Sequence, residues 1–314
     1  MPDEPKIGFN FYRDFVDRAD VFEACPDPNE YPLANGPFPY QGEVYHTDTK
    51  RLSSSVAKTI QNDPDKQRRK LAGEVMGSND SMDFGQVVGE LLALATGGLD
   101  STVESKRFFF ADVARPDKRT KVGQATWGFT ESHANGRSIV WLDQFTSAKR
   151  CADRLLSHPE IAGFMFGSHV LSEWALQARL AEFSNVDAKC MFDWIKFVGP
   201  NQVEVLDIKT SCSPDPWGFR RQVFEFGYHV QERVYRSVAN ACGLQVVRFR
   251  FAVVGSDESA YPAVYELQKE FWLDLATRPV AEAAAKFQAI KTGEFDWLPN
   301  WSHGTVRIET KAEK

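Results

Sequence analysis

The sequence predicts an α/β protein of the α+β kind, in which helices flank a central mixed sheet. Apolar residues recur at helical spacing in the windows before about residue 158 and again after residue 216. Between residues 170 and 211 the period changes, and three strand-like segments follow one another. This order of helices, antiparallel strands, a helix, strands and a last helix is typical of a layered α/β chain.

The first half of the chain is predicted to be mainly helical. Three helices are expected, over about residues 53–61, 81–96 and 143–157. The first begins at Ser53 or Ser54, either of which can cap it, and ends at Asn62-Asp63-Pro64. The second carries apolar side chains around much of its surface and ends at Gly97-Gly98, so we expect it to be buried. Residues 104–142, before the third helix, mix short strands with polar loops.

The second half is predicted to hold the sheet. Its strands are expected over residues 170–180, 187–199, 202–211, 245–256 and 263–268. Gly199-Pro200-Asn201 is a turn signal, which makes the second and third strands a hairpin. One long helix is predicted from Pro216 to Gly243, and another over residues 270–293, with a break near Pro279.

The composition is that of a globular chain. Of its 314 residues, 43% are hydrophobic and 25% are charged, so the chain can bury a core. Its net charge of −6 argues against a surface that coats nucleic acid indiscriminately, but it leaves room for a local basic groove. No apolar run approaches the roughly 20 residues of a membrane span, and the first residues, MPDEPKIGFN, lack a signal-peptide pattern. We therefore expect a cytoplasmic protein without a membrane partner.

The five cysteines are scattered along the chain, and none belongs to a Cys-x-x-Cys pair or another close cluster. A zinc or iron–sulfur site normally needs such a cluster. The cysteines are therefore interpreted as free thiols that pack like small apolar residues.

The predicted hairpin carries three charged residues that are costly to bury. Asp207 and Lys209 are two apart, so they point to the same face of their strand. If the turn has three residues, Val198 faces Gln202 and Asp193 lies opposite Asp207. Two carboxylates about 5 Å apart at their strand positions repel each other, and a hard cation such as Mg²⁺ or Mn²⁺ would remove the conflict.

Two alternatives remain open for this hairpin. A turn of four residues would put Asp193 on the opposite face from Asp207. An Asp-x-Lys sequence also occurs on solvated strand edges that have no function. If the carboxylates do hold a cation, Lys209 is placed to hold an attacking water or to stabilise the developing charge.

The long helix after the hairpin offers a further polar group. Tyr228, Gln231 and Tyr235 are spaced i, i+3 and i+7, so they share one face. An amphipathic helix that packs aromatic side chains on the sheet explains the two tyrosines. The amide of Gln231 would then be buried and would need hydrogen-bond partners, which the Asp-x-Lys strand could supply.

Together these residues resemble the PD-(D/E)XK nuclease superfamily, and most closely the nuclease domain of exonuclease VIII, the RecE type. The resemblance is carried by Asp193, by Asp207-Ile-Lys209 and by Tyr228-His-Val-Gln231-Glu-Arg-Val-Tyr235. Three further stretches are similar to the opening stretch, the first core strand and the closing motif of the family: YHTDTKRLSSSVAKTIQNDPDK, Ser172-Glu173 and Leu298-Pro299-Asn-Trp301. The similarity spans about residues 44–302.

The resemblance implies a domain organisation and a fold. Residues 44–302 would form a nuclease domain with a restriction-endonuclease-like core. Residues 1–43 lie outside the resemblance, and their richness in Pro, Asp, Asn and Gly predicts an extended N-terminal arm with one short helix at about residues 11–23. Residues 303–314 would form a polar C-terminal tail.

The resemblance also implies roles for individual residues. Asp193 and Asp207 would bind the metal, with the main-chain carbonyl of Ile208 as another ligand. Lys209 would be the catalytic lysine. Gln231 and Tyr235 would form the helix motif that supports the site and the DNA strand.

One departure concerns the family motif Gly-x-x-x-His, whose histidine binds the metal. Here the sequence is GQVVGE, with Gly85 in place and Gly89 where the histidine should be. Glu90 is the next residue, about 100° round the helix. Glu90 either replaces the missing ligand or faces water, and loss of the histidine puts metal affinity in question.

The DNA-binding surface is harder to assign. Tyr228, Arg220 and Arg221, at the start of the long helix, are candidates, although the two arginines could equally be a solvated helix face. The basic loop RPDKRTK, residues 115–121, could touch DNA or be a solvated turn.

The resemblance implies a Mg²⁺-dependent exonuclease that degrades double-stranded DNA ends from the 5′ side in recombination or repair. A single-strand annealing protein and further copies of the chain, in a ring-shaped homo-oligomer, are its implied partners. Two alternatives are a structure-specific endonuclease of the same fold and a non-catalytic nucleic-acid-binding module with a degenerate nuclease fold.

Overall fold

The computed structural model describes residues 36–37, 45–46, 48–74, 80–96, 105 and 107–294. Most of the predicted arm, with its helix at about 11–23, lies outside the described residues. So do the closing Leu298-Pro299-Asn-Trp301 motif and the predicted tail, residues 303–314.

Six strands form one mixed sheet in the order β1-β4-β5-β6-β7-β8. The strands are β1 (Gly36–Pro37), β4 (Val170–Leu180), β5 (Val186–Gly199), β6 (Gln202–Ser211), β7 (Gln245–Gly255) and β8 (Pro262–Tyr265). All neighbours are antiparallel except β6 and β7, which are parallel because a helical crossover joins them. The predicted fold class is therefore confirmed, with its mixed sheet and its hairpin.

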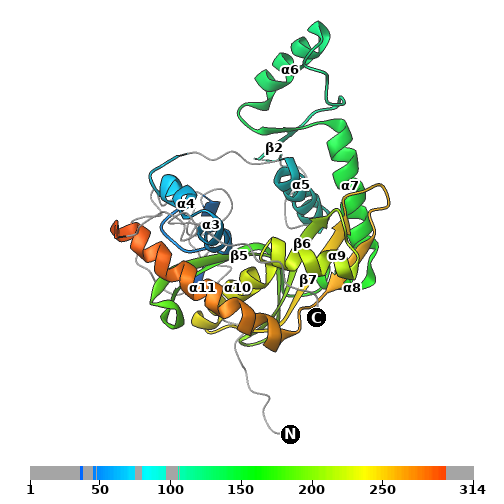
Figure 1. Cartoon of the computed structure of the whole chain (residues 1–314). Coiled ribbons are helices and arrows are strands. Elements are labelled where there is room, and N and C mark those ends of the chain that lie inside the picture. The colour runs from blue at the N-terminus through cyan, green and yellow to red at the C-terminus, as the bar shows by residue number, and fades with distance from the viewer. Residues whose placement is uncertain are drawn as a thin grey trace, which may run out of the picture.

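Helices cover both faces of this sheet (Figure 1). The helices are α3 (Ser54–Asn62), α4 (Pro64–Leu71), α5 (Asp80–Ala95), α6 (Lys121–Ala134), α7 (Leu142–Ser157), α8 (Pro159–Met165), α9 (Pro216–Glu225), α10 (Tyr228–Ala241) and α11 (Lys269–Thr292). One hydrophobic core joins Phe192 and Phe249 of the sheet to α3, α9, α10 and α11. A second core joins Trp194 and Leu206, on the other face, to α5, α7 and α8. Within the described residues, no helix is both long and apolar enough to cross a membrane.

The β5–β6 hairpin has the register that brings the two aspartates together. Trp194 pairs with Leu206, and Phe197 pairs with Val203, as the three-residue turn predicts. The turn itself is different, because Gly199 pairs with Gln202 and an irregularity between Phe197 and Gly199 takes up the extra residue. Of the two alternatives, the register expected from a three-residue turn is the one observed, although the strands are joined by two residues, Pro200 and Asn201.

Two helix predictions need correction. The expected single helix from Pro216 to Gly243 is two helices, α9 and α10, because Gly227 adopts φ +63° and interrupts the regular backbone. The helix expected to break at Pro279 instead runs through it as α11. The proline ring and its missing N–H are accommodated inside this helix, which packs Val280 and Phe287 into the core.

Three further helices, α4, α6 and α8, were not predicted. Two of them begin with proline at the first helical position, and Asp63 caps α4 through a bond to the Lys66 amide (2.9 Å). The third, α6, lies in the segment expected to hold only strands and loops. It sits between β2 (Phe108–Phe110) and β3 (Ser138–Val140), a parallel pair, and lies apart from the main sheet at the top of Figure 1.

Candidate active site

The site is built around two carboxylate side chains, one on β5 and one on β6, at neighbouring positions of the hairpin. Because the ladder ends at Trp194 and Leu206, the next residues across the hairpin are Asp193 and Asp207. Asp193 Oδ2 accepts a hydrogen bond from the Ile208 amide (2.8 Å), so the carboxylate replaces a ladder hydrogen bond. Asp207 is only 1% exposed. The structure thus brings the two predicted carboxylates to the same place.

Asp207 is held from both sides. Its Oδ2 accepts a hydrogen bond from Gln231 Nε2 on α10 (2.5 Å), and its Oδ1 forms an ion pair with the Lys209 ammonium. Lys209 lies two residues further along β6, on the same face, as its spacing predicts. The Asp207 carboxylate is therefore the hydrogen-bond partner that the buried amide of Gln231 was expected to need.

Burial and charge shift the pKa of Asp193 far from its usual range. Burial, followed by the nearby charge of Asp207, raises the pKa of Asp193 from 3.8 to about 7, although Lys209 and the Ile208 amide act against the shift. Burial alone would lower the pKa of Lys209, but the charges of Asp207 and Asp193 more than compensate, so this pKa is raised. The site therefore holds an ammonium that stays charged beside an Asp193 carboxyl that binds a proton more readily than an exposed one.

The two tyrosines of the helix motif are buried supports. Tyr235 packs its ring edge-on against Phe192 (5.2 Å between centroids), and burial raises its pKa well above the usual value. Tyr228 is 8% exposed, and its ring lies 5.1 Å from the Lys209 ammonium. Tyr228 is thus placed beside the site, while its predicted contact with DNA stays a prediction.

The chemistry of these donors fits a divalent cation. Asp193 and Asp207 are adjacent acidic groups in a buried place, and a cation between them would remove the repulsion that raises the Asp193 pKa. Within the described residues, however, no group of three or more His, Cys, Asp or Glu side chains is gathered at metal-binding distance. Two carboxylates, with main-chain oxygens and water, suit Mg²⁺, which keeps several waters when it is bound.

The helix that should carry the family histidine does lie beside β6. A Cβ built on Gly85 would be 3.5 Å from Thr210 Oγ1, whereas a Cβ on Gly89 would meet nothing within 4 Å. Glu90 is 7% exposed, so it does not simply face water. Burial raises its pKa, and the groups that oppose this shift are Ser105 and Arg107. Its predicted role as a metal ligand, like that of the Ile208 carbonyl, stays a prediction.

Two charged residues near the site lie in stretches that carry the family resemblance, but neither was predicted as a site residue. Burial, followed by the like charge of Lys209, lowers the pKa of Lys58 on α3 to about 8, and the charge of Asp207 opposes this shift. Glu173, on β4, adds to the raised pKa of Asp193 and pairs with Arg107 (3.2 Å). The Ser172-Glu173 motif and the positive φ of Glu173, +48°, both mark this position, whereas no local sequence signal distinguishes Lys58 within its stretch.

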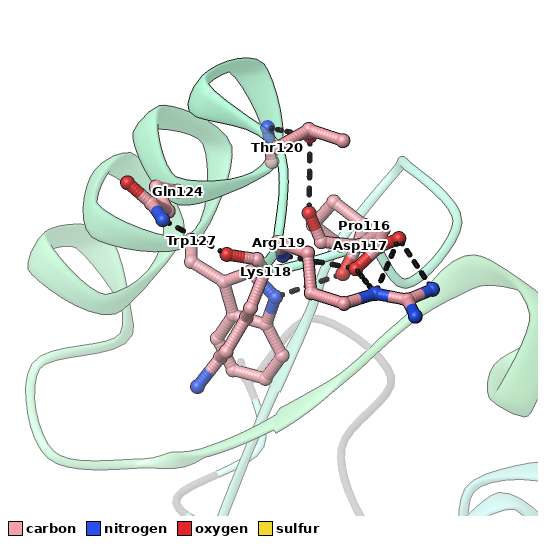
Figure 2. Close-up of polar contacts among 8 residues, drawn as sticks. Pro116, Asp117, Lys118, Arg119, Thr120, Gln124 and Trp127 are labelled. Carbon is pink, nitrogen blue, oxygen red and sulfur yellow. Dashed lines mark hydrogen bonds and ion pairs between the residues drawn. The ribbon is translucent and has the colours of Figure 1, made fainter.

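The remaining DNA-binding candidates lie on other surfaces. Arg220 and Arg221 are exposed on α9, and the Arg220 guanidinium lies 6.0 Å from the Trp217 ring. In the basic loop, Asp117 holds Arg119 by an ion pair (2.9 Å), and the Lys118 ammonium sits 3.5 Å from the Trp127 ring centroid (Figure 2). Residues 117–121 of this loop are exposed, and hydrogen bonds from Gln124 and Trp127 tie the loop to α6, so contact with DNA stays a prediction.

The hairpin pair, the lysine and the supporting helix glutamine define a PD-(D/E)XK-type nuclease fold. The chain belongs to the family described as "PDDEXK-like domain of unknown function (DUF3799)", which it matches over residues 53–297. A search of curated proteins finds no match.

One solved structure supports the fold. The crystal structure of a "Putative exonuclease" from Eubacterium rectale aligns with a TM-score of 0.53 at 13% identity, and the alignment covers 86% of this chain and 94% of that one. A second structure, SSO0001, aligns with a TM-score of only 0.29 at 14% identity, covering 65% and 85% of the two chains.

Proposed function

We propose that the protein is a metal-dependent DNA exonuclease that hydrolyses phosphodiester bonds at double-stranded DNA ends. The observation that carries the proposal is the pair of adjacent carboxylates, Asp193 and Asp207, with the Lys209 ammonium bound to one of them. Such a pair is costly to bury unless it holds a cation and acts on a charged substrate.

Each residue has a task in this proposal. Asp193 and Asp207 would hold the cation, with the carbonyl of Ile208 as a further candidate ligand. Bound Mg²⁺ would supply an activated water and would neutralise charge on the phosphate. Lys209 would stabilise the charge that develops on the phosphate oxygens. Gln231 fixes the orientation of the Asp207 carboxylate through its hydrogen bond (2.5 Å).

The finer parts of the proposal rest on resemblance. The RecE-like residue pattern supports 5′-to-3′ degradation in recombination or repair, with a single-strand annealing protein and further copies of the chain as partners. The name given to the Eubacterium rectale neighbour supports exonuclease over endonuclease. The cytoplasmic location stays a prediction.

The test compares linear and closed circular duplex DNA of the same sequence with increasing Mg²⁺. We expect the linear DNA to lose nucleotides and the circle to stay closed. Asp207→Asn should abolish the release, because it removes a carboxylate of the pair. Cutting of the closed circle would identify an endonuclease instead.

A non-catalytic nucleic-acid-binding module is the second candidate, because Gly89 stands where the family has its histidine. It predicts DNA binding without release of nucleotides at any Mg²⁺ or Mn²⁺ concentration. A wild-type chain that binds the linear duplex but leaves it intact would favour this candidate.

A further inference from the structure

Lys58 belongs to the N-terminal helix α3, yet its ammonium lies in the electrostatic field of the candidate active site. The helix packs on α10, and the Lys58 stem rests against the start of that helix, since a Cβ on Gly227 would come within 2.8 Å of Lys58 Cδ. The Lys58 ammonium lies 6.0 Å from the centroid of the Tyr228 ring, and the Lys209 ammonium lies 5.1 Å from the same centroid. Two ammonium groups therefore border one aromatic ring.

The positive charge of Lys58 is not neutralised by a neighbour. Among the residues that the structure describes, its ammonium has neither a hydrogen-bond nor an ion-pair partner, and its ring contact with Tyr228 is distant. The first turn of α10, against which its stem packs, contains no acidic residue. The opposing charge that acts on its pKa is that of Asp207, whose carboxylate is already bound to Lys209 and Gln231.

A half-buried ammonium without a partner is destabilising in the free protein. The lowered pKa of Lys58, about 8, has burial as its first cause and the like charge of Lys209 as its second. A side chain with this cost is expected where an anionic ligand completes its hydrogen bonds.

We propose that Lys58 is a substrate-positioning residue that binds a phosphodiester oxygen of the DNA backbone beside the Asp207–Lys209 pair. The inference rests on the proposed function and adds to it a second lysine, from a helix about 150 positions earlier in the chain than Lys209. The ammonium donates hydrogen bonds to a non-bridging phosphate oxygen, as Lys does at many phosphate sites.

The charges of the site agree with this role. With Asp193 and Asp207 ionised, Lys58 and Lys209 make the four side chains neutral together. A bound divalent cation would then leave two positive charges for a phosphodiester, which passes from one negative charge to two when water attacks as hydroxide. Without Lys58, one negative charge of that state would remain uncompensated at a buried place.

The test measures DNA binding in chelator, so that it does not depend on cleavage. Lys58→Met keeps the aliphatic stem against Gly227 and removes the charge, and a short fluorescent duplex is titrated at several salt concentrations. We expect affinity to fall about tenfold, as for loss of one charge-assisted hydrogen bond, and the slope of log K against log salt to fall by about 0.9. Lys66→Met, at an exposed lysine on the neighbouring helix α4, is the matched control and should change neither quantity by as much.

Two further measurements distinguish DNA binding from a structural role of Lys58: the unfolding temperature of Lys58→Met and the salt dependence of DNA binding by Lys58→Arg. Lys58→Met should unfold at the same temperature as the parent or higher, because it removes an unpaired charge, whereas loss of a structural contact would lower that temperature. Lys58→Arg should retain the parent's salt slope, since it retains the charge.

Equal affinity and equal slope for Lys58→Met and the parent would overturn the inference. This result is distinct from failure of the proposed function. A parent that releases nucleotides while Lys58→Met binds normally would refute only the role of Lys58. A parent that binds DNA through Lys58 but releases nothing with Mg²⁺ would refute only the nuclease.

Discussion

Asp193 holds a carboxylate in a place where ionisation is unfavourable, and this makes the stability of the metal-free protein depend on pH. Burial and the charge of Asp207 raise its pKa from 3.8 to about 7. Between these two values the folded protein binds more protons than the unfolded chain. The free energy of unfolding therefore falls as pH rises through this window, and the loss is complete above about pH 7.

The substitution Asp193→Asn should remove most of this dependence, because a neutral amide can still accept the bond from the Ile208 amide. We expect its melting temperature in chelator to exceed that of the parent at pH 8 and to approach it at pH 5. Asp187→Asn, on the same strand but in an exposed pair with Arg179, is the control. Thermal unfolding from pH 4 to 8 measures all three, and parallel curves for parent and Asp193→Asn would contradict the assignment.

Lys209 is expected to have a structural role in addition to its proposed role in the chemistry. The side chain of Asp207 is 1% exposed and that of Lys209 is 16% exposed, so Lys209→Met leaves a buried carboxylate without its cation. We expect destabilisation of roughly 3 kcal/mol in chelator, as for a broken buried pair, and recovery when Mg²⁺ is added. Turnover with saturating Mg²⁺ should fall at least about 10²-fold, as for loss of one group that stabilises transition-state charge.

The matched control is Lys149→Met, which breaks a surface pair with Asp153 (2.7 Å). Exposed pairs contribute about 0–1 kcal/mol, so little change is expected. Chemical denaturation with and without Mg²⁺ gives the stability values. A Lys209→Met protein with the parent's turnover would remove Lys209 from the mechanism.

The sequence was sufficient to place most residues of the candidate site. The shared face of Asp207 and Lys209 follows from the two-residue period of a strand. The register that sets Asp193 opposite Asp207 was one of two open alternatives, because it depends on the turn and on the irregularity between Phe197 and Gly199. Lys58 could not be found in this way, because its position depends on how α3 packs on α10. Glu173 belongs to a motif that the sequence does show, but its contact with Arg107 could not be predicted, since it joins segments 66 residues apart.

At the scale of elements, the junction between α9 and α10 orients the helix that carries Gln231. Gly227 adopts φ +63°, and a Cβ there would also press on Lys58. Gly243, at the other end of α10, has φ +81° but nothing within 4 Å of a built Cβ. Substitution of each glycine therefore distinguishes two destabilising effects: both positions have the left-handed backbone, but only Gly227 lies against Lys58.

Gly227→Ala and Gly243→Ala should each lose about 1 kcal/mol or more from the left-handed conformation alone. Gly227→Ala should lose more, and of the two only Gly227→Ala should weaken DNA binding, because it moves the Lys58 stem. Denaturation and duplex titration in chelator measure the two effects. Equal binding by both variants would mean that Lys58 does not contact DNA or adapts to the added methyl group.

The open space at Gly89 gives a test of the missing histidine. Gly89→His should fold, since a built Cβ meets nothing within 4 Å, and should gain a few tenths of a kcal/mol in helix propensity. If the position points into the site, the Mg²⁺ or Mn²⁺ concentration for half-maximal stabilisation should fall. Gly128→His, in α6 and equally open, supplies the control for propensity alone.

Glu90 is tested in the same titration. If Glu90 is a ligand, Glu90→Gln should raise the metal concentration for half-maximal stabilisation by roughly tenfold, the scale of lost ligation support. An unchanged titration in both Glu90→Gln and Gly89→His would leave Asp193 and Asp207 as the only side-chain ligands. That outcome would favour weak metal binding or the non-catalytic alternative.

The elements themselves were predictable where the sequence pattern is strong. The strands β4, β5 and β6 follow from alternation, and α7 from its helical spacing. The helix α6 was missed, because it contains Gly123 and Gly128 and lies apart from the main sheet, so it lacks the apolar periodicity of a core helix. The division of α9 from α10 was missed because a single Gly227 inside an apolar helical pattern is compatible with either result.

For the whole molecule, the net charge of −6 means that the DNA of the proposed function would have to be bound through local positive groups. Lys58 and Lys209 supply two such groups at the site. Arg220 and Arg221 supply two more on the exposed face of α9, whose neighbour α10 contributes Gln231 and Tyr228. The basic loop before α6 is less available, because Arg119 is paired with Asp117 and Lys118 lies over Trp127.

Two helices each carry a pair of consecutive arginines, and the pairs differ in whether acidic side chains neutralise them. Arg220 and Arg221 form no ion pair within the described part of the chain, whereas Arg68 and Arg69 on α4 are paired with Asp65 and Glu74. If α9 follows the DNA backbone, changing both Arg220 and Arg221 to Ala should lower the slope of log K against log salt by about 1.8, or about 0.9 for each phosphate contact.

Changing both Arg68 and Arg69 to Ala removes the same formal charge from arginines whose charge is already compensated, so a smaller decrease in slope is expected. Titration of one fluorescent duplex at four salt concentrations measures both variants beside the parent. Equal decreases would mean that the protein attracts DNA only through its overall charge. A larger decrease for the α9 variant would assign α9 to the DNA path, because release of counterions requires that the lost cations had contacted phosphates.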